Sequence, residues 1–287
     1  MAEMNKKHLS KTAWAALIGK WLFLGIMIIF TLYPVVYTVL GSLKTNAELT
    51  QGGGFFPAAW HFENYYQAFV QADFTKYTIN SVIVSASVTL LAAATCSLAG
   101  FILARKDFAG KKVLMALYLS MMFVSLGSVT LYPIYELLRA LKLNKTIFAL
   151  IIALTGGQAA NVFLVMGFTK GIPRELDEAA IIDGCSLYGV YSRIILPLSK
   201  PILAVVALFS FRNAWNDYIT SLIMTISKPK LQTLTVAVVQ LKYSVNAAAE
   251  WHIMLAGASI AIIPILIVYL FANKQFIAGL TAGAVKG

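Results

Sequence analysis

Charged residues are scarce in this sequence, at only 12% of 287 positions, whereas 59% are hydrophobic and the mean hydropathy is +0.77. Soluble domains carry about 25% charged residues, so this deficit largely excludes a soluble enzyme and indicates that lipid is the solvent. The cations outnumber the acids and give a net charge of +11. Because they lie between the apolar runs rather than in one patch, we attribute them to membrane topology and expect no nucleic-acid partner.

Cysteine and histidine are also rare. Two cysteines, Cys96 and Cys185, are too few for a disulfide framework, and the three histidines, His8, His61 and His252, lack the spacing of metal ligands. The sequence has no recognisable nucleophilic triad or carboxylate pair, and it lacks the G-x-x-x-x-G-K-[ST] phosphate loop. We therefore expect no catalytic residue, metal or cofactor in this chain, and we do not expect an enzyme.

Six apolar runs are long enough to cross the hydrocarbon core of a bilayer. At a rise of 1.5 Å per residue, about 20 helical residues span a core about 30 Å thick. The first run follows a basic stretch, but it is too long for a secretory signal and no small-residue cleavage site follows it. We predict an all-α polytopic membrane protein with six transmembrane helices, at residues 21–43, 77–104, 113–135, 146–168, 201–226 and 253–272.

These spans set the organisation of the chain and place both termini on one side of the membrane. Residues 1–76 are expected to hold an N-terminal tail, the first span and the first outer loop, residues 77–272 a core with spans two to six, and residues 273–287 a C-terminal tail. Lysine and arginine are more numerous in the loops that face inward when both termini are cytoplasmic, which is the bias expected of membrane proteins. The dibasic sequences at 105–106 and 111–112 are the firmest anchor.

The inner loop 169–200 is too long and too patterned for a simple connection between membrane helices. Pro173 suits a first helical turn, and the acidic residues after it favour a helix N-terminus. These acidic residues are Glu175, Asp177 and Glu178. Gly184 is suited to a left-handed conformation that ends the helix. The pattern predicts a helix-turn-helix on the inner face, with helices at 173–183 and 187–195. This helix-turn-helix either docks into a groove on another protein or lies at the membrane surface as an amphipathic helix.

This loop also carries residues with fixed spacing. Glu178-Ala179-Ala180 is followed after three residues by Gly184, after nine more by Ile194, and after one more by Leu196-Pro197. The pattern resembles the EAA motif of permease subunits in bacterial ATP-binding-cassette (ABC) importers, and the spacing matches at every fixed position.

Three further segments resemble one branch of that family. The ending 279–287 is similar to the C-terminal tail of the smaller permease of the maltose transporter and of related oligosaccharide importers. The pairs Asn64-Tyr65 and Asn80-Ser81 fit the same branch.

The resemblance implies the ABC importer type I permease fold in the bacterial inner membrane, and it implies partners. These are a second homologous permease subunit, a cytoplasmic ATPase dimer that binds ATP and Mg, and an extracytoplasmic solute-binding protein. The residues that it implies for coupling to the ATPase are Glu178, Ala179, Ala180, Asp183, Gly184, Ile194, Leu196 and Pro197. The residues of the tail that would contact the ATPase are Thr281, Ala282, Gly283, Val285, Lys286 and Gly287.

Span five contains a polar cluster that is costly in hydrocarbon unless it faces protein or water. Its candidate members for a translocation pathway are Asn213, Trp215, Asn216, Asp217 and Tyr218. At helical spacing, Asn213, Asn216, Asp217 and Thr220 share a face, with Trp215 and Tyr218 partly to its side. Amides, a carboxylate and aromatic rings suit a sugar. Hydrogen bonding to neighbouring helices is the equally supported alternative. For Gln158 and Asn161 in span four, we favour helix packing.

The sequence thus predicts a permease subunit that imports an oligosaccharide or related carbohydrate by alternating access, with ATP hydrolysis in a separate chain. Import of a polyol or a glycerol phosphate is a close alternative. A phosphate ligand would need cationic side chains in the passage, and Arg212 is the only arginine or lysine within a predicted span. A gradient-driven secondary transporter is less well supported, because no internal repeat is evident and the inner helix-turn-helix would have no purpose.

Overall fold

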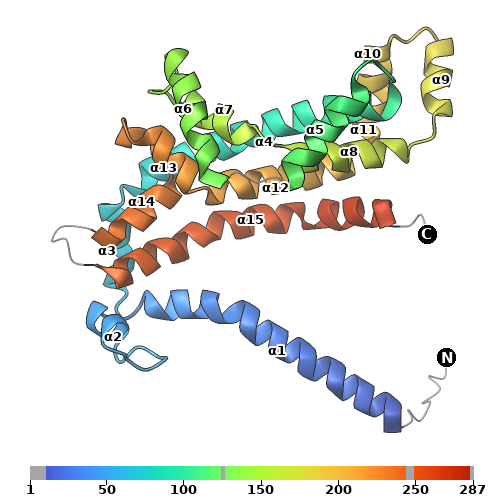
Figure 1. Ribbon diagram of the computed structural model, residues 1–287. Coiled ribbons are helices and arrows are strands. Elements are labelled where there is room, and N and C mark those ends of the chain that lie inside the picture. Colours follow the sequence, from blue (N-terminus) through green and yellow to red (C-terminus); the bar gives the residue numbers. More distant parts are fainter. Residues whose placement is uncertain (1–10, 124–126, 244–248, 285–287) are drawn as a thin grey trace.

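The computed structural model describes residues 11–123, 127–243 and 249–284, and all regular structure within these ranges is helical (Figure 1). Three helices are long and apolar enough to cross a membrane without interruption: α1 (Lys11–Gly41), α4 (Phe74–Arg105) and α15 (Trp251–Ala284). They contain the first, second and sixth predicted spans. The chain is therefore a polytopic all-α membrane protein, as predicted.

Two bent pairs of helices are also long and apolar enough to cross a membrane when each pair is taken as one segment. The fourth predicted span consists of α7 (Ile147–Thr155) and α8 (Ala159–Lys170), which meet at 53°. Gly157, at the junction, has a φ of +70°, which glycine adopts at little cost. The second pair joins the segment Leu187–Leu198 to α12 (Lys200–Asn216) at 76°.

The fifth predicted span is wrong as one continuous helix. Instead of running through 201–226, α12 ends at Asn216, the backbone is extended at Asp217 with φ −66° and ψ 125°, and α13 covers Ile219–Thr225. Polar groups near the break supply the hydrogen bonds that an unbroken helix would have made internally.

The third predicted span, 113–135, also differs from one continuous helix. It covers α5 (Lys111–Phe123), a short 3₁₀ turn (Gly127–Thr130) and the first half of α6 (Leu131–Ala140). Residues 124–126 lie outside the described residues. At 1.5 Å per residue, the 13 residues of α5 are too short to cross a hydrocarbon core alone.

Helix α4 lies at the centre of the bundle, where it contacts α7, α8, α12 and α14 (Leu234–Gln240). Its buried face is rich in small residues, which let helices approach closely. At Gly100 a Cβ atom would lie only 2.7 Å from Val165 Cγ1 of α8, so this contact requires glycine. Helices α4, α12 and α15 run side by side, whereas α1 contacts α15 but diverges from the bundle towards its start, and its most apolar window of 18 residues contains no buried residue (Figure 1).

The two ends of the bundle differ in the segments that they carry. The small helices α2 (Asn46–Thr50), α3 (Glu63–Gln71) and α14 lie at one end (Figure 1). At the other end lie α9 (Glu175–Ile182), the start of α1 and the end of α15. This arrangement places the patterned loop 169–200 at the same end as both ends of the described chain.

Candidate functional site

The inner loop folds as the predicted helix-turn-helix. Its first helix, α9, ends where Gly184 adopts a φ of +84°, and the amide of Cys185 donates to the carbonyl of Ala180 at 2.9 Å. Ser186 then caps α10 (Leu187–Val190) by accepting a hydrogen bond from the amide of Gly189 at 3.2 Å. The second helix continues as a π-helical turn (Tyr191–Ile195) and α11 (Leu196–Leu198), so it extends beyond the predicted end at 195.

The residues of the EAA-like motif divide between a buried and an exposed side of this loop. Ala180 is buried in an apolar cluster with Phe101 of α4, and Ile194 packs against the same cluster. Leu196 is half-buried and Pro197 is exposed. The exposed members at α9 are Glu178, Ala179, Asp183 and Gly184. Ile182, which sequence reasoning missed, lies among them with 85% of its surface exposed. Exposed apolar surface next to acidic side chains is typical of a protein-binding face.

Three residues of α4 at helical spacing hold this loop. Ser97 Oγ lies 2.6 Å from the hydroxyl of Tyr191, and the ring of Phe101 is 5.3 Å from that of Tyr191. Arg105 forms an ion pair with Asp177 of α9, with 2.7 Å between Nε and Oδ2, and donates from Nη2 to the carbonyl of Ile172 at 2.9 Å. Sequence analysis treated Arg105 only as a topology signal. Ser97, Phe101 and Arg105 recur every four residues and therefore lie on one face of α4. This spacing was the signal that could have identified the face that contacts the inner loop.

The polar cluster of predicted span five lies at the break between α12 and α13. Asp217 Oδ1 accepts hydrogen bonds from the amide (2.7 Å) and the hydroxyl (2.9 Å) of Ser221, so this carboxylate caps α13. The hydroxyl of Thr235 donates to the carbonyl of Trp215 at 2.7 Å. Asn213 and Asn216 lie about one turn apart on α12, but Asp217 lies beyond its end, so the prediction of one helical face that continues through Asp217 and Thr220 is wrong.

The structure separates the pathway candidates by exposure. Trp215 is buried, stacks on Phe211 at 5.7 Å, and donates from Nε1 to the carbonyl of Ala261 at 3.2 Å. This placement favours the packing alternative for Trp215. Asn213 and Asn216 are exposed, and Tyr218 is half-buried.

The second polar set, in the bent fourth span, packs helices together as predicted. Asn161 donates to the side chain of Gln158 and, across to α12, to Ser210 Oγ at 3.3 Å. Gln158 also lines a mostly apolar cavity of about 490 Å³ between α4, α5 and the junction of α7 and α8.

The predicted C-terminal tail continues the last span. Helix α15 runs through Ala284, so Thr281, Ala282 and Gly283 are helical rather than part of a separate tail. Val285, Lys286 and Gly287 lie outside the described residues.

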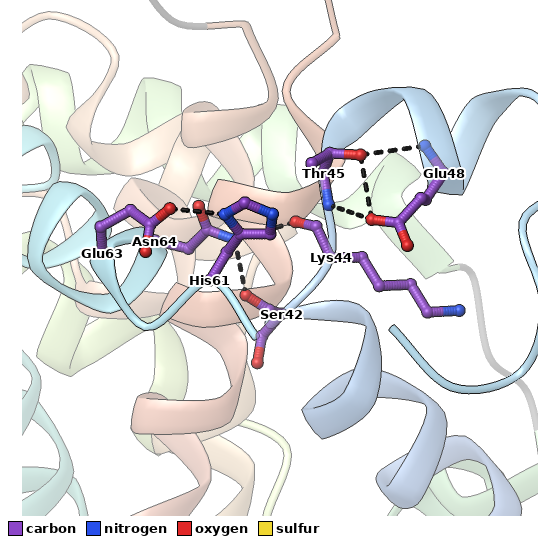
Figure 2. A network of polar contacts seen from close by, with 7 residues as sticks. All are labelled: Ser42, Lys44, Thr45, Glu48, His61, Glu63 and Asn64. Carbon is purple, nitrogen blue, oxygen red and sulfur yellow. Dashed lines mark hydrogen bonds and ion pairs between the residues drawn. The ribbon is translucent and has the colours of Figure 1, made fainter. Parts of the chain in front are cut away.

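At the opposite end of the bundle, polar side chains between α1 and α3 bond to one another and to the backbone (Figure 2). Asn64 donates to the carbonyls of Ser42 and Lys44, both at 2.9 Å. Glu48 and Thr45 form a reciprocal capping box at the start of α2. Hydrogen bonds from the amides of Ala58 and Thr45 lower the pKa of Glu48 from 4.5 to about 2.

The second pair of residues from the branch resemblance also joins two segments. Asn80 of α4 donates to the carbonyls of Lys230 and Gln232 at 3.0 and 2.9 Å, and Ser81 Oγ accepts from the amide of Leu234 at 2.8 Å. The pairs Asn64-Tyr65 and Asn80-Ser81 therefore hold loops at this end.

This fold and inner loop match known transport proteins. The model of the family "Binding-protein-dependent transport system inner membrane component" matches residues 96–280. The arabinooligosaccharides transport system permease protein AraQ of Halalkalibacterium halodurans is 31% identical, with 99% of this chain and 100% of that protein covered. The melibiose/raffinose/stachyose import permease protein MelC of Bacillus subtilis is 34% identical, with 88% and 91% covered.

A solved structure gives the same fold. A chain of a bacterial ABC transporter involved in the import of alginate matches with a TM-score of 0.78 at 21% identity, covering 94% of this chain and 100% of that chain. The protein belongs to the binding-protein-dependent transport system inner membrane components, the ABC transporter permeases. Members of this family are transporter subunits rather than enzymes.

Proposed function

We propose that this chain is one of two membrane-spanning subunits of an ATP-driven importer that carries an oligosaccharide or related carbohydrate inward by alternating access. The support for the substrate class comes from relatives at 30–34% identity that are permeases for arabinooligosaccharides, for maltodextrin, and for melibiose, raffinose and stachyose. A solute-binding protein would deliver the sugar from outside. The second, homologous permease would complete the passage.

The observation that carries this proposal is the exposed face of α9. Glu178 and Ala179 are exposed beside Ile182, whereas Ala180 on the other side of the helix anchors it to α4. A small alanine permits close backbone approach, and the carboxylate of Glu178 can pair with a base on a partner. This face suits a groove on a cytoplasmic ATPase dimer, which would bind ATP and Mg and move the spans as rigid bodies.

The arrangement of the chain ends supports an orientation with both termini in the cytoplasm. The start of α1, the end of α15 and α9 lie at one end of the bundle (Figure 1). The dibasic sequences at 105–106 and 111–112 flank the nearby turn between α4 and α5. In this orientation the end of α15, from Thr281 to Gly283, would lie on the ATPase side, together with residues 285–287.

We place the passage for the sugar at the break between α12 and α13. Asn213 and Asn216 are exposed on this chain, and Asp217 and Tyr218 lie at the break itself. The amides offer both donors and acceptors to sugar hydroxyls. Trp215 supports the wall of the passage from inside the subunit, because it is buried against α15.

A polyol or a glycerol phosphate is the second candidate substrate, and an anionic glycoside would share the negative charge of the glycerol phosphate. Arg212 is exposed one residue before Asn213, and no ion pair to it is found within the described residues. A relative at 32% identity is the sulfoquinovosyl glycerol transport system permease protein SmoH of Agrobacterium fabrum. Competition of transport by neutral and anionic glycosides, in wild type and Arg212→Gln, separates the two classes.

The decisive experiment is to purify the tagged chain from native membranes in mild detergent, with Glu178→Lys alongside. We expect the wild type to retain an ATPase, a second permease and a solute-binding protein. Glu178→Lys should lose the ATPase, with unfolding within about 0.5 kcal/mol of wild type, since Glu178 is exposed. The control is Glu136→Lys on α6, which should retain the ATPase. Recovery of the wild-type chain alone would contradict the proposal.

The passage is tested by Asn216→Ala in proteoliposomes. Loss of one or two hydrogen bonds to a neutral sugar should weaken transport about five- to thirtyfold, with the ATPase still bound. Ser120→Ala, an exposed hydroxyl on α5, is the control. Transport by Asn216→Ala at the control level would remove this residue from the passage.

A further inference from the structure

Arg105 and Asp177 form the only ion pair between α4 and α9 among the described residues. Their side chains are only 5% and 15% exposed, and Nε of Arg105 lies 2.7 Å from Oδ2 of Asp177. The same guanidinium donates to the carbonyl of Ile172, just before α9 begins. Arg105 therefore holds α9 at two points, one in its first turn and one in the chain that enters it.

A guanidinium suits this role better than an ammonium group. Its donors lie in a planar, rigid fork, so two contacts fix an orientation as well as a distance. A buried charge that loses its partner is costly. The ion pair therefore opposes any displacement of α9 that would separate Arg105 from Asp177. Asp177 immediately precedes Glu178. When Asp177 is held against α4, the rotation of α9 about its axis is set, and Glu178 remains on the exposed side.

The path from this pair into the membrane is short. Arg105 ends α4, and Phe101 and Ser97, one and two turns earlier, contact Tyr191 of the second helix of the loop. One face of α4 thus holds both helices of the loop. Between them, Gly100 packs directly on α8, and α4 also contacts α12.

We infer that Arg105 is the positioning residue that orients the Glu178 face of α9 and transmits displacement of α9 into α4. This inference rests on the proposed function, in which a partner ATPase displaces α9. In this arrangement α9 and α4 move as one body, and the spans packed on α4 follow. Without the pair, α9 stays attached to the loop through Ala180 and the surrounding apolar cluster, so the ATPase still docks but its movement is not passed on.

The test uses the whole complex in proteoliposomes, with Asp177→Asn, Arg105→Lys and the charge exchange Arg105→Asp with Asp177→Arg. Three quantities are measured: the ATPase retained per permease, sugar transport, and the sugar transported per ATP hydrolysed. For Asp177→Asn we expect full retention of the ATPase, a fall of about tenfold or more in transport, and a lower ratio of sugar to ATP. Arg105→Lys keeps the charge but loses the fork, so its transport should be intermediate. The charge exchange re-forms the ion pair but loses the hydrogen bond to the carbonyl of Ile172, so its transport should exceed that of Asp177→Asn without reaching that of wild type.

The matched control is Asp107→Asn. Asp107 pairs with Lys111 at 2.9 Å in the same turn, but its side chain is 95% exposed and it has no contact with α9 among the described hydrogen bonds and ion pairs. This variant should match wild type in all three quantities. The inference is overturned if Asp177→Asn transports within twofold of wild type with an unchanged ratio. It is also overturned if the charge exchange transports no better than Asp177→Asn, or if lost transport is explained by lost ATPase. A wild-type chain that retains no ATPase would instead contradict the proposed function.

Discussion

The two ends of this bundle use their polar side chains in opposite ways. At the end that carries α2 and α3, Asn64 and Glu48 bond to neighbouring backbone within the chain (Figure 2). At the end that carries α9, Glu178 and Asp183 are exposed next to Ile182. Polar groups that bond to their own chain serve its folding, whereas exposed acids beside exposed apolar surface suit another protein.

The inner end nevertheless has its own internal attachments. Arg105 and Ala180 hold the buried side of α9, so that only one side is available to a partner. A helix that a partner binds and displaces needs one side packed rigidly on its own chain and the other side exposed. The comparison predicts that substitutions at the outer end reduce stability, and that substitutions on the exposed side of the inner end reduce function alone.

The largest loss of stability is expected for Asn64→Ala. This side chain is 4% exposed, and its removal leaves the carbonyls of Ser42 and Lys44 without their donor. Each buried unsatisfied group costs about 1–3 kcal/mol, so the loss of two such hydrogen bonds should lower the free energy of unfolding by about 2–6 kcal/mol. Unfolding by heat or SDS in detergent measures this loss. Gln67→Ala, on the exposed side of the same helix, should stay within about 0.5 kcal/mol of wild type. Equal stability of the two variants would contradict the assigned role of Asn64.

A smaller and local loss is expected for Gly184→Val at the inner end. A Cβ atom at this position would meet nothing within 4 Å, so the cost comes only from the backbone φ of +84°. A left-handed conformation costs a residue other than glycine about 1–2 kcal/mol. Amide hydrogen exchange in α9 should accelerate about tenfold, while global unfolding changes little. Gly189→Ala is the control, because Gly189 is helical and its Cβ would make an ordinary contact at 3.4 Å. Unchanged exchange in Gly184→Val would show that the turn does not limit the stability of α9.

The inner loop could be predicted from the sequence because its signals are local. An acidic first turn and Gly184 mark the two ends of α9 within ten residues, and the EAA-like spacing identifies the loop. The bend after α7 also had a local signal, the adjacent Gly156 and Gly157, which sequence analysis did not use to predict a break.

The break at Asp217 had no comparable signal. It depends on Ser221, one helical turn later, and on Thr235 from another segment, which donates to the carbonyl of Trp215 near the end of α12. The burial of Trp215 depends equally on α15, to whose backbone it donates. The partner of Arg105 lies 72 positions along the chain, in α9. Contacts between distant segments decide these features, so a window of sequence that predicts a span cannot predict them.

The smallest effect expected at the outer end is on the pH dependence of stability. The backbone amides of Ala58 and Thr45 hold the pKa of Glu48 at about 2, below its ordinary value of 4.5. A carboxyl group with a lowered folded-state pKa contributes stability above its unfolded pKa, and this contribution is lost as the pH falls from about 4.5 towards 2. In Glu48→Gln, the melting temperature in detergent should therefore decline less steeply than in wild type over this range. The control Gln67→Ala should keep the slope of the wild type. If Glu48→Gln also kept that slope, the capping box at α2 would not contribute to the acid sensitivity of this end, and other carboxylates would have to account for it.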